Sequence, residues 1–216
     1  MDSIQFTPVQ ARVLAVLVEK SVTTPQYYPM TVNAVRQAAN QKSARDPVMA
    51  LDEGEVGAAL RSLEEPPFVA RDDRGSRSIK WRHRFGHQLL IKPPALAVLA
   101  ALMLRGPQTA AELRAHAAGM GGPDTVEEVG AILLELADRA QPLIAQLPRQ
   151  SGQSAVRYGQ LLCGELADAV APTQASMATA AAAAPQPGLR ERVEALEARV
   201  AELEQLLTAP TQPSED

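Results

Sequence analysis

The stretch Glu55–Leu63, EVGAALRSL, decides the fold because it returns later in the chain as Glu128–Leu136, EVGAILLEL, with six of nine positions identical. A second matched pair, Val13–Leu17 and Val98–Leu102, lies upstream of the first pair in the same order. Two matched segments in one order predict a duplicated unit. The alternative is a chance likeness between helices that are rich in alanine and leucine.

The two copies differ in length, since the upstream pair is 85 residues apart and the downstream pair 73. The longer first copy holds two polar stretches, Thr24–Asn33 and Asn40–Met49. The former carries two of the three tyrosines, and its prolines Pro25 and Pro29 prevent a helix. We interpret this insertion as a partner surface; the alternative is that it only shapes turns and packs the two copies together.

Each copy predicts three helices followed by a β-hairpin. N-cap signals open the helices at Thr7-Pro8, Thr31, Asp52-x-x-Glu55, Thr109-x-x-Glu112 and Asp124-x-x-Glu127, with a further helix from about Pro94 to Arg105. Alternating segments predict strands at 68–71, 79–85, 143–147 and 155–158. This order is typical of a winged helix. We therefore expect an α+β protein, mainly α with small β-hairpins, with tandem winged-helix units at 1–88 and 89–163 that pack together.

The composition changes from about residue 164. Residues 164–187 are rich in Ala, Pro, Gln, Ser and Thr, which indicates a flexible linker. Residues 188–208 then show apolar side chains at heptad spacing, and 209–216 read as a disordered tail. The heptad seam predicts a coiled-coil-like helix and a possible parallel homodimer; the alternative is a helix that folds back on the body. Its residues are Leu189, Val193, Leu196, Val200, Leu203 and Leu207.

Composition indicates a cytoplasmic protein. The chain is 46% hydrophobic, and its formal charge is −4. Residues 164–216 contribute −6, from 3 Lys/Arg and 9 Asp/Glu, and the rest of the chain contributes +2. One cysteine, Cys163, cannot form an intrachain disulfide, which fits a reducing compartment. We expect no signal peptide and no membrane partner, because no apolar run approaches the length that spans a bilayer.

No pattern in the sequence predicts catalysis. The histidines His83, His87 and His116 lack the spacing and the cysteine or acidic neighbours of a metal site. We therefore expect no catalytic residue, no cofactor and no metal, and predict that the protein is not an enzyme.

The predicted first hairpin, which we call the first wing, is strongly basic. Its candidate phosphate-binding residues are Arg74, Arg77, Lys80, Arg82 and Arg84. Alternation predicts that Lys80, Arg82 and Arg84 share one face and that Trp81 points to the core. The alternative is an ordinary solvated hairpin. The third helix of each copy is acidic, which argues against reading of DNA in the major groove.

The run Asn40–Met49, with Leu104–Thr109 and Leu147–Arg149, resembles the YceH-like family of uncharacterised bacterial proteins over roughly residues 5–163. One departure from that pattern is Ala39, where the family has a cysteine. The resemblance implies a tandem winged-helix fold and no established activity.

We therefore predict a non-enzymatic adaptor with an unidentified protein partner. The candidate partner surface consists of Tyr27, Tyr28, Asn40, Lys42, Arg45 and Asp46. The alternative is a nucleic-acid-binding regulator that contacts phosphates through the first wing.

Overall fold

The computed structural model describes residues 4–72, 78–149 and 155–164. All of the described residues belong to one compact unit of the chain. The predicted linker, heptad seam and tail, and the wing residues Arg74 and Arg77, lie outside the described residues.

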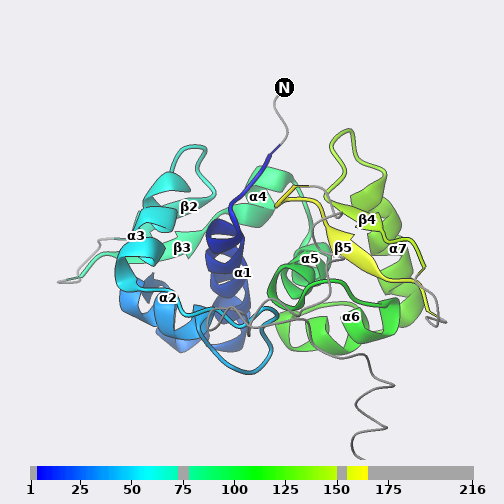
Figure 1. The fold of residues 1–216 in the computed structure, drawn as a ribbon, viewed down its shortest axis with the longest axis horizontal. Coiled ribbons are helices and arrows are strands. Elements are labelled where there is room, and N and C mark those ends of the chain that lie inside the picture. The colour runs from blue at the N-terminus through cyan, green and yellow to red at the C-terminus, as the bar shows by residue number, and fades with distance from the viewer. Residues whose placement is uncertain (1–3, 73–77, 150–154, 165–216) are drawn as a thin grey trace, which may run out of the picture. The chain divides into compact units, whose positions relative to one another are not determined.

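The described part has an α+β fold, as predicted (Figure 1). Its first half contains α1 (Pro8–Thr23), η1 (Pro25–Tyr27), β1 (Met30–Thr31), α2 (Val32–Ala39), α3 (Glu53–Ser62), β2 (Val69–Asp72) and β3 (Lys80–His83). A short helix, α4 (Phe85–Leu89), leads to α5 (Pro93–Arg105), α6 (Ala110–Ala117), η2 (Ala118–Met120), α7 (Val126–Ala137), β4 (Ile144–Gln146) and β5 (Tyr158–Gln160). None of the helices in this part of the chain is long and apolar enough to cross a membrane.

Side-chain caps fix where the helices begin. The predicted capping boxes at Asp52 and Thr109 open α3 and α6. Thr7 is the N-cap of α1, as predicted, and it also forms a capping box with Gln10. The prediction for α7 was wrong by one residue, because Thr125 caps this helix instead of Asp124. The Glu128 carboxylate accepts the backbone N–H groups of both residues, so it pairs with the threonine one position later.

Two small antiparallel sheets complete the fold. One has the strand order β1-β3-β2 and the other pairs β4 with β5. Trp81 on β3 is only 3% exposed and points to the core, as predicted. Arg84 does not continue that strand: β3 ends at His83, and Arg84 is the N-cap of α4 because Phe85 turns into the core. The winged-helix assignment itself stays a prediction.

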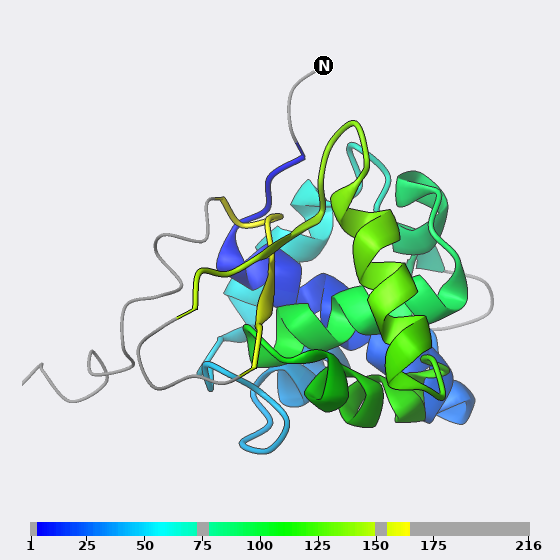
Figure 2. The same ribbon diagram turned by 90° about the vertical axis from the view of Figure 1, so that its right-hand side faces the viewer.

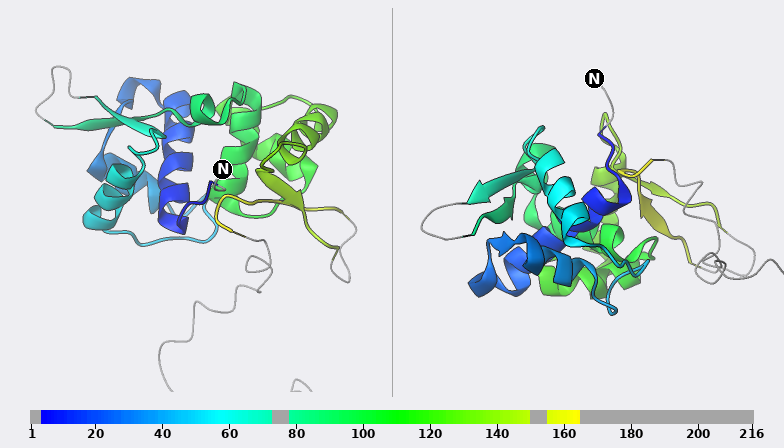
Figure 3. Two further views of the ribbon diagram at one scale, coloured as in Figure 1. Left: turned by 90° about the horizontal axis from the view of Figure 1, so that it is seen from above. Right: turned by 60° about the vertical axis from the view of Figure 1, so that its left-hand side comes forward.

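Helices α1 and α5, the matched first helices of the two copies, pack against each other at the centre of the described part (Figures 1 and 3). Nine of the 13 residues of α5 are buried, which explains why this helix is apolar on nearly every face. The hairpins β2–β3 and β4–β5 lie on opposite sides of the helix pair (Figure 3). Residues from both predicted units therefore share one hydrophobic core.

Candidate functional site

The turn between α2 and α3 is built around Arg45. Its side chain is fully buried, although exposed polar residues flank it in the sequence. The guanidinium forms an ion pair with Glu19 on α1 at 2.6 Å and donates to the carbonyl oxygen of Ala38 and to Gln41 Oε1. Because its own side chain is buried against these partners, Arg45 holds the turn against α1 and offers little surface to another molecule.

Asn40 and Asp46 close the same turn. The Asn40 side-chain amide donates to the Leu51 carbonyl at 2.8 Å and accepts the Leu51 N–H at 2.9 Å. It thus satisfies both backbone polar groups of Leu51. The Asp46 backbone N–H donates to the carbonyl of Leu104, near the end of α5, at 2.8 Å. That carbonyl has no partner within its helix. Of the candidate partner residues in this turn, Lys42 and Asp46 are exposed.

Sequence reasoning missed Arg12, a buried cation on α1. It is 1% exposed, and its guanidinium donates to the carbonyl oxygens of Ala39 and Pro47. Burial lowers the pKa of Arg12, and the nearby positive charge of Arg45 lowers it further. The sequence feature that could have indicated this buried cation is a single arginine within the long apolar stretch of α1. Two arginines thus tie the turn to α1.

The two adjacent tyrosines have different roles. The Tyr28 hydroxyl accepts the backbone N–H of His83 at 2.6 Å, and burial raises the pKa of Tyr28 to about 12. Tyr27, in contrast, is 74% exposed on η1, which packs against α1. Val22, in the last turn of α1, is also exposed, at 48%. Of the pair, Tyr27 alone faces solvent.

Two of the cations in the described part of the first wing are held in ion pairs. Arg71 forms an ion pair with Glu64 at 2.6 Å and stacks over the Trp81 ring, 5.2 Å from its centroid. Arg82 forms an ion pair with Asp72 on the facing strand. Lys80 is half-buried and Arg84 is exposed.

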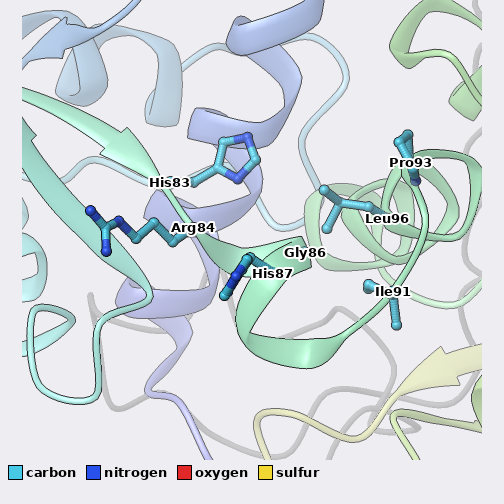
Figure 4. Close-up of a pocket in the computed structure, with 7 residues that line it drawn as sticks. All are labelled: His83, Arg84, Gly86, His87, Ile91, Pro93 and Leu96. Atoms are coloured by element: carbon cyan, nitrogen blue, oxygen red, sulfur yellow. The ribbon is translucent and has the colours of Figure 1, made fainter.

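A hollow of about 460 Å³ lies where β3, α4 and α5 meet (Figure 4). His83, Arg84 and His87 provide its polar groups beside the apolar Ile91 and Leu96. Burial lowers the pKa of His83 to about 4, so this imidazole is neutral near pH 7. In Figure 4, Arg84 points away from Leu96. The polar side chains therefore do not converge on one point in the hollow.

In the described ranges, no group of three or more His, Cys, Asp or Glu side chains is arranged to hold a metal ion. Cys163 is exposed. The described body is thus an α+β scaffold in which buried polar residues fix turns and several apolar side chains face solvent.

The chain belongs to the bacterial family described as a protein of unknown function, DUF480, whose model matches residues 6–153. It is 44% identical to a UPF0502 protein of Geobacter metallireducens over 196 residues, which cover 91% of this chain and 85% of that protein. It is 43% identical to a UPF0502 protein of Mesorhizobium japonicum over 204 residues, 94% and 95% of the two chains. The family match extends from before α1 to beyond β4.

Proposed function

We propose that this chain is a non-enzymatic adaptor that binds another protein through the surface around Tyr27. The supporting observation concerns the seven aromatic side chains, all of which are described. The three phenylalanines and Trp81 are buried, Tyr28 and Tyr158 are half-buried, and Tyr27 is 74% exposed. Tyrosine gives a large contact area with a polar end and is enriched where protein interfaces gain most of their binding energy.

The rest of the predicted partner surface divides into supporting and exposed residues. Arg45, Asn40 and Tyr28 hold the two polar stretches in place through their buried hydrogen bonds. Lys42 and Asp46 are exposed and can provide polar contacts to a partner. The adaptor surface that we propose is therefore centred on Tyr27, with Val22 beside the same end of α1.

Immobilised full-length protein, exposed to a lysate of its own bacterium, tests this proposal by quantitative mass spectrometry. We expect the Tyr27→Ala variant to lose at least one protein that the wild type retains, because the substitution removes the exposed aromatic ring. Leu90→Ala is the matched control, since Leu90 is 82% exposed directly after α4, outside the two polar stretches. If Tyr27→Ala retains every protein that the wild type retains, the proposal fails.

A second candidate function is nucleic-acid binding through a winged-helix hairpin. The order α1-β1-α2-α3-β2-β3 and the exposed Arg84 favour it, whereas the ion pairs of Arg71 and Arg82 and the acidic residues of α3 oppose it. Fluorescence anisotropy with duplex DNA and with RNA at low salt separates the two functions. Binding that weakens steeply with salt and with Lys80→Ala or Arg84→Ala would favour this candidate; a flat titration excludes it.

A further inference from the structure

Helix α7 is apolar on its outward face as well as on its inward face. Val129, Leu133 and Leu136 are buried. On the other side Val126 is 39% exposed and Leu134 is 72% exposed. Figure 2, in which the second half of the described chain faces the viewer, shows α7 at the surface. An outward face at the surface is normally polar, so this one requires an explanation beyond folding.

The repeat provides an internal comparison for that face. Matching Glu128–Leu136 to Glu55–Leu63 places Val126 at the position of Glu53 and Leu134 at the position of Arg61. The corresponding residues of α3 are thus charged and exposed. The inward positions keep their apolar character in both copies, as they do at Val56 and Val129. The requirements of folding therefore account for the inward face of each helix. The outward face is apolar on α7 and charged on α3.

Gly130 lies between Val126 and Leu134, one helical turn from each. A Cβ added at Gly130 would meet no atom within 4 Å, whereas one added at the matched Gly57 would lie 3.3 Å from the Arg61 side chain. A glycine inside a helix costs about 1 kcal/mol relative to alanine. Because the fold leaves this space open, packing within the chain does not require the glycine. A glycine here lets another backbone approach closely.

The charge around this face selects the kind of partner. Acidic residues surround it: Asp124, Glu127, Glu128, Glu135 and Asp138. The adjacent cation, Arg139, donates to the backbone carbonyl of Leu89. Two copies docked through α7 would bring like charges together, which disfavours self-association. A helix with an apolar stripe between lysines or arginines matches both the shape and the charge.

We propose that the outward face of α7, formed by Val126, Gly130, Ala131 and Leu134, docks a basic amphipathic helix of a partner protein. The inference rests on the proposed function in one respect, because both proposals hold that the chain binds another protein. The α7 face and the Tyr27 surface are different surfaces, so either can fail while the other stands.

A titration of the full-length protein with a fluorescent synthetic helix tests the inference. The probe carries a leucine and alanine stripe flanked by lysines, and the control probe carries the same stripe flanked by glutamates. We expect the lysine probe to bind at low salt, to weaken as salt rises, and to bind far more tightly than the glutamate probe. Equal binding of the two probes, or no binding of the lysine probe at low salt, would overturn the inference.

Substitutions then locate the bound helix. We expect Leu134→Arg, which introduces the residue of the other copy, to weaken binding about tenfold or more. Leu90→Arg makes the same chemical change directly after α4, where Leu90 is 82% exposed, and should leave the affinity unchanged. Tyr27→Ala should also leave it unchanged, which separates this inference from the proposed function. Equal loss in Leu134→Arg and Leu90→Arg would overturn the inference.

Two further readouts complete the test. Circular dichroism melting should show that Leu134→Arg unfolds at the wild-type midpoint, because Leu134 is outside the core. Gly130→Ala should weaken probe binding without lowering that midpoint, since the added Cβ would meet no atom of the chain within 4 Å. Light scattering that shows a dimer lost in Leu134→Arg would identify a second copy as the occupant and would overturn the inference.

Discussion

Arg45 connects three parts of the fold through one side chain. It bonds Glu19 on α1, the last turn of α2 through Ala38, and Gln41 in the turn. We expect Arg45→Met to lower the free energy of unfolding by about 2–4 kcal/mol, because it leaves the Glu19 carboxylate without its buried partner. Urea denaturation measures the change. Lys42→Met, an exposed neighbour, should stay within about 0.5 kcal/mol of wild type; equal effects of the two substitutions would contradict a supporting role for Arg45.

His83 makes the stability of the protein depend on pH. Its Nε2 atom lies 3.2 Å from Ser21 Oγ, and its buried Nδ1 atom has no hydrogen-bond partner among the described residues. Burial lowers the pKa of His83 to about 4, against 6.5 for a free histidine. The unfolded chain therefore takes up a proton near pH 6.5, while the folded chain stays neutral until about pH 4.

The free energy of unfolding should thus fall as the pH drops from about 6.5 to 4, by at most about 3 kcal/mol from this group. His83→Gln removes the titrating group. The free energy of unfolding of the wild type should therefore approach that of the variant as the pH falls. Urea denaturation at several pH values measures both proteins. Burial also lowers the pKa of His116. The free energy of unfolding of the variant should therefore still fall toward low pH, but less steeply than that of the wild type. Parallel pH profiles for the two proteins would contradict the role of His83.

At the scale of elements, the start of α7 offers a matched pair of substitutions. The Thr125 hydroxyl accepts the Glu128 N–H at 3.2 Å, whereas the Asp124 side chain makes no cap contact. We expect Thr125→Ala to cost about 1 kcal/mol of unfolding free energy. Asp124→Ala should cost only a few tenths of a kcal/mol through the helix dipole. Thermal unfolding of both variants checks the order, and a larger loss for Asp124→Ala would contradict the observed cap.

The capping signals explain how much of the fold could be predicted from the sequence. Most helix starts carry a capping residue and an acidic or amide partner within one turn, so local chemistry alone locates them. At α7 two overlapping signals, at Asp124 and Thr125, fit the sequence equally well. Helix α4 and strand β1 could not be predicted, because five and two residues are too short to show a period. Tertiary contacts determine both.

The candidate site was less predictable than the fold. The sequence placed Arg45 on a surface because polar neighbours surround it, yet its partners are Glu19, far away in the chain, and backbone carbonyls. Adjacent residues such as Tyr27 and Tyr28 have the same chemistry, but Tyr27 is exposed and Tyr28 is half-buried, so composition cannot separate them. Only contacts between distant segments distinguish a supporting residue from an exposed one.

At the scale of the whole described unit, the two copies of the repeat are held together by more than the packing of α1 and α5. The Phe6 N–H donates to the Leu162 carbonyl at 2.6 Å, and Asp46 reaches the end of α5 through its backbone. The first copy thus uses the last described segment of the second. Because the two copies share a core and are joined by these backbone hydrogen bonds, we expect both to unfold in one cooperative transition.

Leu99→Ala tests this cooperativity from the second copy. Leu99 lies on α5 and is 0% exposed, so the variant should lose about 2–5 kcal/mol of unfolding free energy. The single tryptophan, Trp81, lies in the first copy, and its fluorescence reports unfolding there. In urea, the fluorescence midpoint should shift together with the far-UV circular dichroism midpoint, because neither copy keeps its buried face once α5 has left α1. An unchanged fluorescence midpoint beside a shifted circular dichroism transition would mean that the first copy folds independently.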